Sequence, residues 1–230
     1  MAFELAAQEK PSASTRVEPQ LRISEIFYSL QGEAATVGIP TVFIRLSGCP
    51  LRCVYCDTAY AFHGGEVRNM QEILTEVKRH PSRYITVTGG EPLAQKNCLK
   101  LLEDLVDEGY EVSLETSGAM NIRKIDDRVS IVMDLKTPSS GEQHRNKYEN
   151  IQYLSRKDQI KFVIAGREDY IWAKQQLEKY ALTEKCLVLF SPVADQQNPT
   201  ELADAILQDG LAVRFQMQLH KYLWGDVAGR

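Results

Sequence analysis

Long apolar runs are missing from this sequence: none approaches the roughly 20 residues that a helix needs to cross a bilayer. An excess of basic charge is also missing, because 27 Lys and Arg residues stand against 31 Asp and Glu residues, which gives a formal net charge of -4. This balance gives no electrostatic reason to expect nucleic acid or an anionic membrane as a partner. The opening residues, MAFELAAQEKPSASTR, have neither the basic start nor the apolar stretch of a secretory signal. We therefore expect a cytoplasmic protein.

Repeats, low-complexity tracts and obvious linkers are absent as well, which favours a single folded unit. The 230 residues are 43% hydrophobic and 25% charged, which suits one soluble domain with a sizeable core. We predict a mobile N-terminal segment over residues 1–20 and one domain over residues 21–230.

Cysteine is scarce and unevenly placed. The chain has five cysteines, an odd number that argues against a disulfide framework in a reducing compartment. Cys98 and Cys186 stand alone among apolar neighbours, so we expect them to be buried as small hydrophobic side chains. The other three cysteines fall within eight residues of one another. Any cysteine chemistry is therefore expected in that short segment.

Short apolar runs alternate with longer amphipathic ones along the chain. Eight runs are typical of strands: 23–29, 41–47, 84–88, 111–116, 129–135, 160–165, 186–192 and 213–219. Four segments have apolar positions at helical spacing: 70–80, 97–109, 167–180 and 199–210. Two of these end in Gly109 and Gly210, where a left-handed cap is common. The alternation predicts an α/β fold with a mostly parallel sheet and outer helices, and about six strand–helix units favour a partial (β/α) barrel.

Unusual residues directly follow several of these strands. Cys49 follows the run 41–47, and Gly89-Gly90-Glu91-Pro92 follows the run 84–88. Active sites in parallel α/β folds lie at the carboxyl ends of the strands. We therefore expect these residues to share one site.

The cysteine cluster reads Cys49-Pro-Leu-Arg-Cys53-Val-Tyr-Cys56. Thiolates this close repel one another unless a cation binds them, and soft sulfur ligands select iron–sulfur clusters, zinc or copper(I). A structural zinc site completed by His63 is one interpretation. The other is a four-iron cluster held by only three cysteines, which leaves one iron open to bind a substrate or cofactor.

The Cys-x₃-Cys-x₂-Cys spacing, with Tyr55 before the last cysteine, resembles the signature of the radical S-adenosylmethionine (SAM) superfamily. In that superfamily the amine and carboxylate of SAM chelate the open iron of a [4Fe-4S] cluster, and the reduced cluster releases a 5′-deoxyadenosyl radical from SAM. The Gly-Gly-Glu-Pro turn is a second feature of the superfamily, in the right order. The resemblance implies that Cys49, Cys53 and Cys56 hold the cluster, and it disfavours zinc.

The flanking residues resemble one family within this superfamily. The stretches IFYSLQGEA, FIRLSGCP, CDTAYAF, TVTGGEP, ETSG, DLKTPSSGE and QLHKYLWG, in order between Ile23 and Gly225, are similar to 7-carboxy-7-deazaguanine synthases (the QueE family). The resemblance implies a lyase that converts 6-carboxy-5,6,7,8-tetrahydropterin to 7-carboxy-7-deazaguanine with release of ammonia, in queuosine and deazapurine biosynthesis. It also implies a homodimer and a flavodoxin or ferredoxin-type reductant.

The same resemblance supplies candidate substrate-binding residues. These are Leu30, Gln31, Gly32, Arg45, Thr88 and His220. An amide and backbone groups can bind the edge of a pterin ring, and a planar guanidinium suits a carboxylate. Thr58 matches a ligand of Mg²⁺, since a hydroxyl is a hard oxygen donor, and the ion would neutralise the substrate carboxylate.

The candidate SAM-binding residues also come from the resemblance. They are Tyr55, Cys56, Asp57, Gly90, Glu91, Glu115, Asp134, Leu135, Lys136, Ser191, Pro192, Val193 and Ala194. Glu91 is expected to accept from an ammonium group and Glu115 from a ribose hydroxyl. The chain has Asp134-Leu135-Lys136 where some relatives have Ser-Pro-Lys, so the contacts expected there are those of the backbone.

Two other functions share parts of this pattern. An activating enzyme that installs a glycyl radical on a protein partner has the same cysteine motif, but it gives no reason for the LQGE, CDT and QLHK stretches. A non-catalytic iron–sulfur or zinc protein would need the cysteines alone. Iron and sulfide analysis of anaerobically purified protein separates the zinc protein from the others.

Overall fold

The computed structural model describes residues 18–225 and 227–229. Residues 1–17, most of the predicted N-terminal segment, lie outside the described residues. The first strand begins at Gln20, next to Leu21, where we expected the domain to start.

A single nine-stranded sheet forms the centre of the fold, in the order β3-β1-β2-β4-β5-β6-β7-β8-β9. The strands are β1 (Gln20–Leu30), β2 (Pro40–Leu46), β3 (Glu66–Asn69), β4 (Tyr84–Gly89), β5 (Glu111–Thr116), β6 (Ser130–Asp134), β7 (Gln159–Ile164), β8 (Leu187–Pro192) and β9 (Arg214–Phe215). From β2 to β9 in sheet order every neighbouring pair is parallel. Strand β1 is antiparallel to both β2 and β3. The mostly parallel sheet confirms the predicted α/β class.

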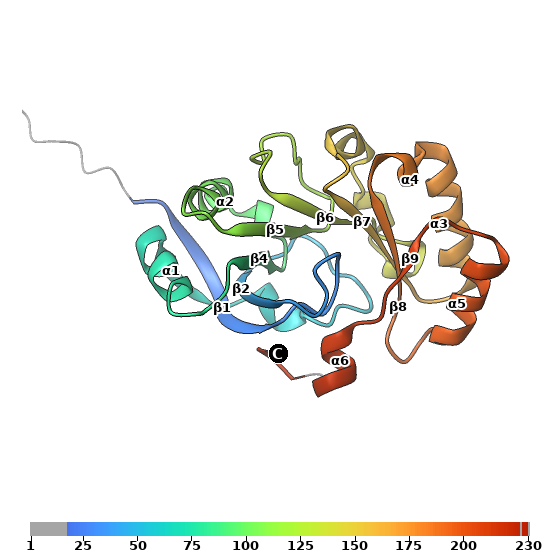
Figure 1. The fold of residues 1–230 in the computed structure, drawn as a ribbon, viewed down its shortest axis with the longest axis horizontal. Coiled ribbons are helices and arrows are strands. Elements are labelled where there is room, and N and C mark those ends of the chain that lie inside the picture. Colours follow the sequence, from blue (N-terminus) through green and yellow to red (C-terminus); the bar gives the residue numbers. More distant parts are fainter. Residues whose placement is uncertain (1–17, 226, 230) are drawn as a thin grey trace, which may run out of the picture.

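Helices cover the outside of the sheet. They are α1 (Met70–Val77), α2 (Cys98–Asp107), α3 (Arg167–Tyr180), α4 (Leu182–Lys185), α5 (Pro199–Gln208) and α6 (Leu219–Trp224). Short 3₁₀ turns are η1 (Ala59–Phe62), η2 (Pro92–Ala94), η3 (Pro138–Ser140), η4 (Gln143–Arg145) and η5 (Tyr148–Tyr153). Figure 1 shows the strands in an arch from β1 to β9, with α1 to α5 outside it and α6 near the gap between its ends. Because the sheet does not close, it is the predicted partial barrel.

The hydrophobic core lies between the sheet and the outer helices. Strand β4 is buried from Ile85 to Thr88, as expected for a parallel strand covered on both faces. Gly109 and Gly210 have φ values of +89° and +59° just after α2 and α5, so both predicted left-handed caps are confirmed. Cys98 and Cys186 are buried free thiols, as predicted.

The strand predicted over residues 213–219 is wrong beyond its first few residues. Strand β9 covers only Arg214–Phe215, and pairing with β8 ends at the hydrogen bond from the Gln216 N–H to the Phe190 carbonyl at 2.9 Å. The Gln216 amide binds the backbone of Ala34 twice: it accepts from the N–H at 2.7 Å and donates to the carbonyl at 2.9 Å. The chain then crosses to the end of β1, where the N–H of Leu219 donates to the carbonyl of Gly32 at 3.0 Å. Helix α6 thus connects the two ends of the open sheet.

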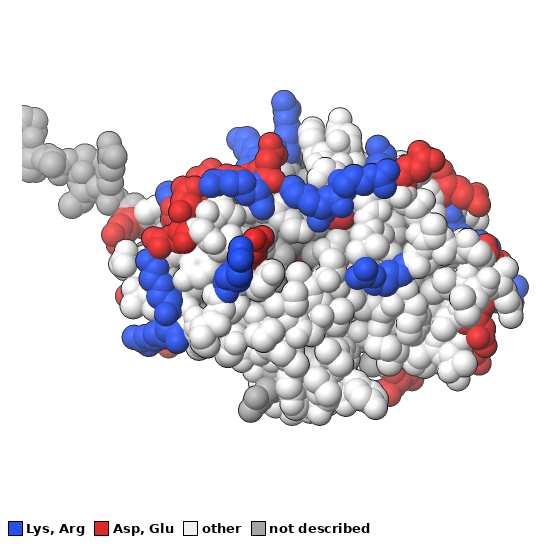
Figure 2. Space-filling model, viewed as in Figure 1, with Lys and Arg blue, Asp and Glu red and all other residues white. Residues whose placement is uncertain are grey.

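Charged side chains of both signs are interspersed on the face of the molecule shown in Figure 2, and the lower part of that face is mostly uncharged. Among the described residues, no helix combines the length and hydropathy that a membrane crossing requires.

Candidate active site

A cavity of about 750 Å³ lies at the carboxyl ends of the parallel strands. Most of the predicted site residues line it: Leu30, Gln31, Gly32, Arg45, Cys49, Cys53, Tyr55, Cys56, Asp57, Thr58, Thr88, Gly90, Glu115, Asp134, Lys136, Val193, Ala194 and His220. These residues come from segments far apart in the sequence. The parallel strands bring most of them together because these strands end at one edge of the sheet. Leu30, Gln31 and Gly32 instead come from the end of the antiparallel β1, where Leu30 pairs with Pro40 at the start of β2.

Four of the predicted SAM-binding residues lie outside the cavity wall: Glu91, Leu135, Ser191 and Pro192. Leu135 is fully buried, and its N–H donates to the carbonyl of Lys161 at 3.0 Å. Ser191 is buried within β8. The roles proposed for these residues stay predictions.

The three cysteines of the cluster motif line the same cavity from one loop after β2. Each is a half-buried free thiol. Burial raises the pKa of all three, that of Cys53 to about 11, while the Lys136 ammonium opposes the rise. No group of three or more His, Cys, Asp or Glu side chains within residues 18–225 and 227–229 is arranged to hold a metal ion. In donor chemistry, however, three thiols on one loop fit a [4Fe-4S] cluster with one open iron.

The glycine turn after β4 approaches the cysteine loop more closely than any side chain would allow. A Cβ atom at Gly90 would lie 2.3 Å from the carbonyl oxygen of Gly48 and 2.8 Å from the Cβ of Cys49. Gly89 has a φ of +144°, a conformation that other residues rarely adopt. The Gly-Gly pair therefore lets backbone groups form this part of the wall.

Glu91, the third residue of that turn, is fully buried and directed into the protein. Its carboxylate accepts hydrogen bonds from the Thr116 hydroxyl at 2.9 Å, from the Ser117 N–H at 2.8 Å and from the Leu93 N–H at 3.1 Å. These contacts join the ends of β4 and β5. They occupy the oxygens that we expected to receive an ammonium group.

Gln31, Thr88 and Glu115 form a connected polar group on the cavity wall. The Thr88 hydroxyl donates to Glu115 at 2.8 Å, and the Gln31 amide donates to the other Glu115 oxygen at 3.3 Å. The same amide also donates to the Thr86 hydroxyl at 3.0 Å. Residues predicted to bind substrate and a residue predicted to bind SAM are thus in direct contact.

Arg45 is held in place by groups that we did not predict. Its Nε donates to Glu25 at 2.7 Å, and the same carboxylate oxygen accepts from the Tyr60 hydroxyl at 2.7 Å. The guanidinium carbon lies 5.7 Å from the ring centre of Phe27 and 5.8 Å from that of Tyr60. An arginine fixed on one side in this way presents its remaining N–H groups in a defined direction.

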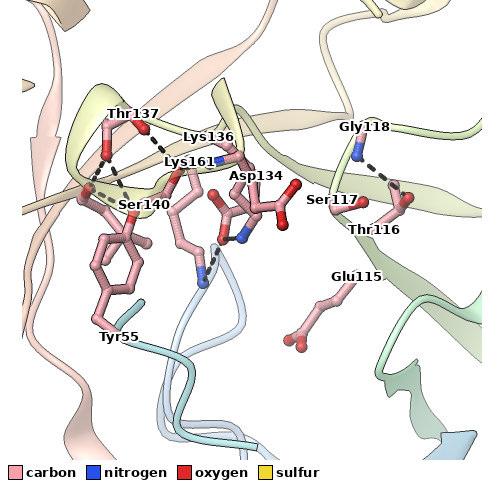
Figure 3. A network of polar contacts seen from close by, with 12 residues as sticks. Tyr55, Glu115, Thr116, Ser117, Gly118, Asp134, Lys136, Thr137, Ser140 and Lys161 are labelled. Atoms are coloured by element: carbon pink, nitrogen blue, oxygen red, sulfur yellow. Dashed lines mark hydrogen bonds and ion pairs between the residues drawn. The ribbon is translucent and has the colours of Figure 1, made fainter. Parts of the chain in front are cut away.

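A buried ion pair that we also did not predict lies on the same wall. The Lys161 ammonium is 2.5 Å from Glu33. It is also 3.9 Å from Asp134, and Figure 3 shows these two side chains beside each other. Asp134 pairs with Lys136 at 2.9 Å through the same oxygen, and its other oxygen, Oδ1, is buried with no hydrogen-bond partner. Asp134 lines the cavity, and an unsatisfied buried carboxylate oxygen is a natural acceptor for an N–H or O–H group.

The predicted magnesium ligand Thr58 lines the cavity beside Asp57. Its hydroxyl donates to Asp57 at 2.8 Å, which leaves the lone pairs of the hydroxyl oxygen for another partner. The Asp57 carboxylate lies 3.4 Å from Lys221 and accepts from Gln218 at 3.2 Å. Burial disfavours the charged form of Asp57, but these neighbours outweigh it and lower the pKa of Asp57 to about 2.

His220, at the start of α6, packs directly on the predicted substrate loop. A Cβ atom at Gly32 would lie 2.0 Å from the His220 Nδ1, so glycine is needed for this approach. The cavity wall on this side is therefore built jointly by α6 and the end of β1.

Comparison with known proteins identifies the family of this chain. Residues 43–165 match the model of the radical SAM superfamily. The chain is 41% identical over 214 residues to the 7-carboxy-7-deazaguanine synthase of Chlorobaculum tepidum, an alignment that covers 92% of this chain and 97% of that protein. It belongs to the 7-carboxy-7-deazaguanine synthase family. Another member, from Thermoplasma acidophilum, is 37% identical and aligns over 90% of this chain and 99% of its own length.

The fold agrees with this family. The crystal structure of QueE from Escherichia coli matches with a TM-score of 0.73 and 22% identity, over 87% of this chain and 95% of that one. The region that matches the radical SAM superfamily, residues 43–165, contains the cysteine loop described above. A [4Fe-4S] cluster and SAM are therefore the cofactors of this protein, as its family implies.

Proposed function

We propose that this chain is a 7-carboxy-7-deazaguanine synthase. It converts 6-carboxy-5,6,7,8-tetrahydropterin to 7-carboxy-7-deazaguanine and releases ammonia. The observation that supports this most strongly is the 41% identity to a curated synthase over 92% of the chain, together with one cavity lined by both the cysteines and the substrate candidates. A glycyl-radical activating enzyme would not account for that similarity.

When bound, the cluster and SAM supply a carbon-centred radical that starts the reaction. The protein's own residues hold the reactants. Cys49, Cys53 and Cys56 would hold the cluster, and the backbone around Gly90 would receive the methionyl end of SAM. The unpartnered Oδ1 of Asp134 supports a role for its side chain as an acceptor for SAM, in addition to the backbone contacts expected there.

The substrate would lie on the opposite part of the wall. Gln31, Thr88 and the backbone near Gly32 would bind the edge of the pterin ring, with His220 beside them. Arg45, fixed by Glu25, would bind the carboxylate of the substrate. Mg²⁺ on the Thr58 hydroxyl would orient and neutralise the substrate carboxylate while the ring nitrogen is lost.

The remaining features of the proposal concern the setting of the enzyme. We infer that it works in the cytoplasm as a homodimer and receives electrons from a flavodoxin or ferredoxin-type reductant. Size measurement in solution and turnover with each purified reductant test these two inferences.

The decisive experiment is an anaerobic incubation of cluster-loaded enzyme with 6-carboxytetrahydropterin, SAM, Mg²⁺ and a chemical reductant, followed by mass spectrometry. The expected products are 7-carboxy-7-deazaguanine and an equal amount of ammonia. A variant Gln31→Leu, which keeps the cluster loop intact, should lose most of the product while retaining four irons. Absence of the product from the unmodified enzyme would refute the proposed substrate.

A further inference from the structure

The cysteine loop rests on residues 137–142, a segment to which we have so far given no function. This segment follows Asp134–Lys136 directly and contains the turn η3. It therefore lies between the part of the chain that would bind SAM and the loop that would bind the cluster. Figure 3 shows Tyr55 of the cysteine loop directed at Thr137 and Ser140 of this segment.

Three hydrogen bonds fasten the cysteine loop to the segment. The N–H of Val54 donates to the carbonyl of Ser140 at 3.0 Å, and the N–H of Arg52 donates to the Glu142 carboxylate at 2.6 Å. The Tyr55 hydroxyl lies 3.0 Å from the Thr137 hydroxyl. The first two bonds involve the residues on either side of Cys53, so the segment determines where that thiol lies.

The segment is itself held by Asp169, in the first turn of α3. This side chain is fully buried, and each of its oxygens accepts one backbone hydrogen bond. Oδ1 accepts from the N–H of Ser139 at 2.9 Å, and Oδ2 accepts from the N–H of Ala165 at 2.9 Å. The Asp169 carboxylate thus ties the segment to the carboxyl end of β7, and its place in the first turn of a helix favours the negative charge.

We propose that Asp169 is a positioning residue, which fixes the cluster-binding loop relative to the SAM-binding segment by anchoring residues 137–142. The proposal rests on the proposed function only in taking the three cysteines as the cluster site and Asp134–Lys136 as part of the SAM site. Two backbone hydrogen bonds to one buried charge hold the segment more rigidly than neutral contacts of the same geometry would.

The chain offers a matched control in Asp158. This residue is also buried, precedes β7 directly, and accepts backbone hydrogen bonds from Ile131 at 2.9 Å and Ser155 at 2.8 Å. Asp158 therefore anchors the backbone at the amino end of β7, as Asp169 anchors the backbone at its carboxyl end. Asp158 is absent from the residues that line the cavity.

The experiment compares cluster-loaded wild-type enzyme, Asp169→Asn and Asp158→Asn under anaerobic conditions. One assay follows the loss of cluster absorbance in the presence of an iron chelator, and a second measures KM separately for SAM and for the pterin. Asn presents an NH₂ group to one of the two backbone donors, so one charge-assisted hydrogen bond is lost. We expect Asp169→Asn to lose its cluster about 10-fold faster and to raise KM for SAM about 10-fold, with KM for the pterin unchanged.

The control variant should lower the thermal stability without changing either readout. The proposal is overturned if Asp169→Asn behaves like the wild type, or if Asp158→Asn speeds cluster loss to the same extent. Should Asp169→Asn fail to fold, Glu142→Ala decides: it removes only the acceptor for Arg52, and cluster loss should become about 3-fold faster. An unchanged rate in that variant also overturns the proposal. The chelator assay needs no pterin, so it gives an answer even if the substrate assignment fails.

Discussion

The buried ion pair between Lys161 and Glu33 allows a quantitative prediction about the free energy of unfolding. Lys161→Met keeps the apolar stem of the side chain and removes its ammonium group, which leaves Glu33 without its cation. The three side chains concerned, those of Glu33, Asp134 and Lys161, are only 12%, 17% and 15% exposed. Removing one partner of a buried pair costs about 3–5 kcal/mol.

The lower end of that range applies here, because both carboxylates keep another partner. Glu33 still accepts from Gln218 at 2.7 Å, and Asp134 still pairs with Lys136 at 2.9 Å. We therefore expect Lys161→Met to lower the free energy of unfolding by about 3 kcal/mol. In a domain of this size that loss lowers Tm by about 6–12 °C.

Thermal unfolding of the cluster-free protein, followed by circular dichroism, measures the effect. The double variant Lys161→Met/Glu33→Gln should recover about 2 kcal/mol, because it no longer buries an unpaired charge. Lys174→Met is the matched control: it breaks a pair with Asp209 whose side chains are 32% and 36% exposed, and it should cost much less than Lys161→Met because solvent screens exposed pairs. If Lys161→Met costs no more than this control, or if Glu33→Gln restores nothing, our account of the ion pair is wrong.

Further predictions concern the cluster, the metal, the substrate and pH. Cys53→Ala should abolish assembly of the four-iron cluster, measured by iron content, while circular dichroism shows an intact α/β fold. Thr58→Ala should lose stimulation of turnover by Mg²⁺ and keep the cluster. Glu25→Gln, which weakens the support of Arg45, should raise KM for the pterin about 10-fold with little change in KM for SAM. Burial raises the pKa of Glu33, but attraction to Lys161 outweighs burial and holds this pKa below the ordinary 4.5. Wild type should therefore be more stable than Glu33→Gln above pH 4.5. This difference in the free energy of unfolding should vanish as the pH falls through the lowered pKa.

Each of these predictions has an outcome that contradicts it. A full complement of iron in Cys53→Ala, or loss of the cluster in Thr58→Ala, would exclude the assigned ligand roles. An equal rise of both KM values in Glu25→Gln would indicate general distortion in place of substrate binding. A stability difference between wild type and Glu33→Gln that persists at the lowest pH would show that the Glu33 charge is not its source.

Much of the fold could be predicted because its signals are local. Buried parallel strands have continuous apolar runs, and helices α2 and α5 end at glycines that the sequence shows plainly. Strand β3 was missed because its four residues, Glu66–Asn69, lie at the edge of the sheet and have no apolar pattern. Strand β9 was predicted too long because the chain from Gln216 onward bonds to the end of β1, through Ala34 and Gly32, which lie far from it in the sequence.

The site residues also divide into those that local motifs reveal and those that depend on contacts between distant parts of the chain. The cysteines and the glycine turn are recognised by short motifs, whose spacing the local chain determines. The ion pair of Glu33 and Lys161 joins the loop after β1 to β7, far apart in the sequence. Its one sequence signal was a lysine within the apolar run of β7, where a buried charge needs a partner. The direction of Glu91 could not be read from the motif, because Thr116 and Ser117 determine it from the neighbouring strand.

The contact of Gly90 with Gly48 has a consequence for any attempt to redesign this enzyme. A side chain at Gly90 would collide with the backbone of Gly48. The distance between Cys49 and the glycine turn therefore cannot be changed by substituting Gly90. On the proposed function, side-chain substitutions that alter SAM affinity belong at Asp134 and Lys136, where the Asp134 carboxylate has one oxygen paired with Lys136 and one without a hydrogen-bond partner.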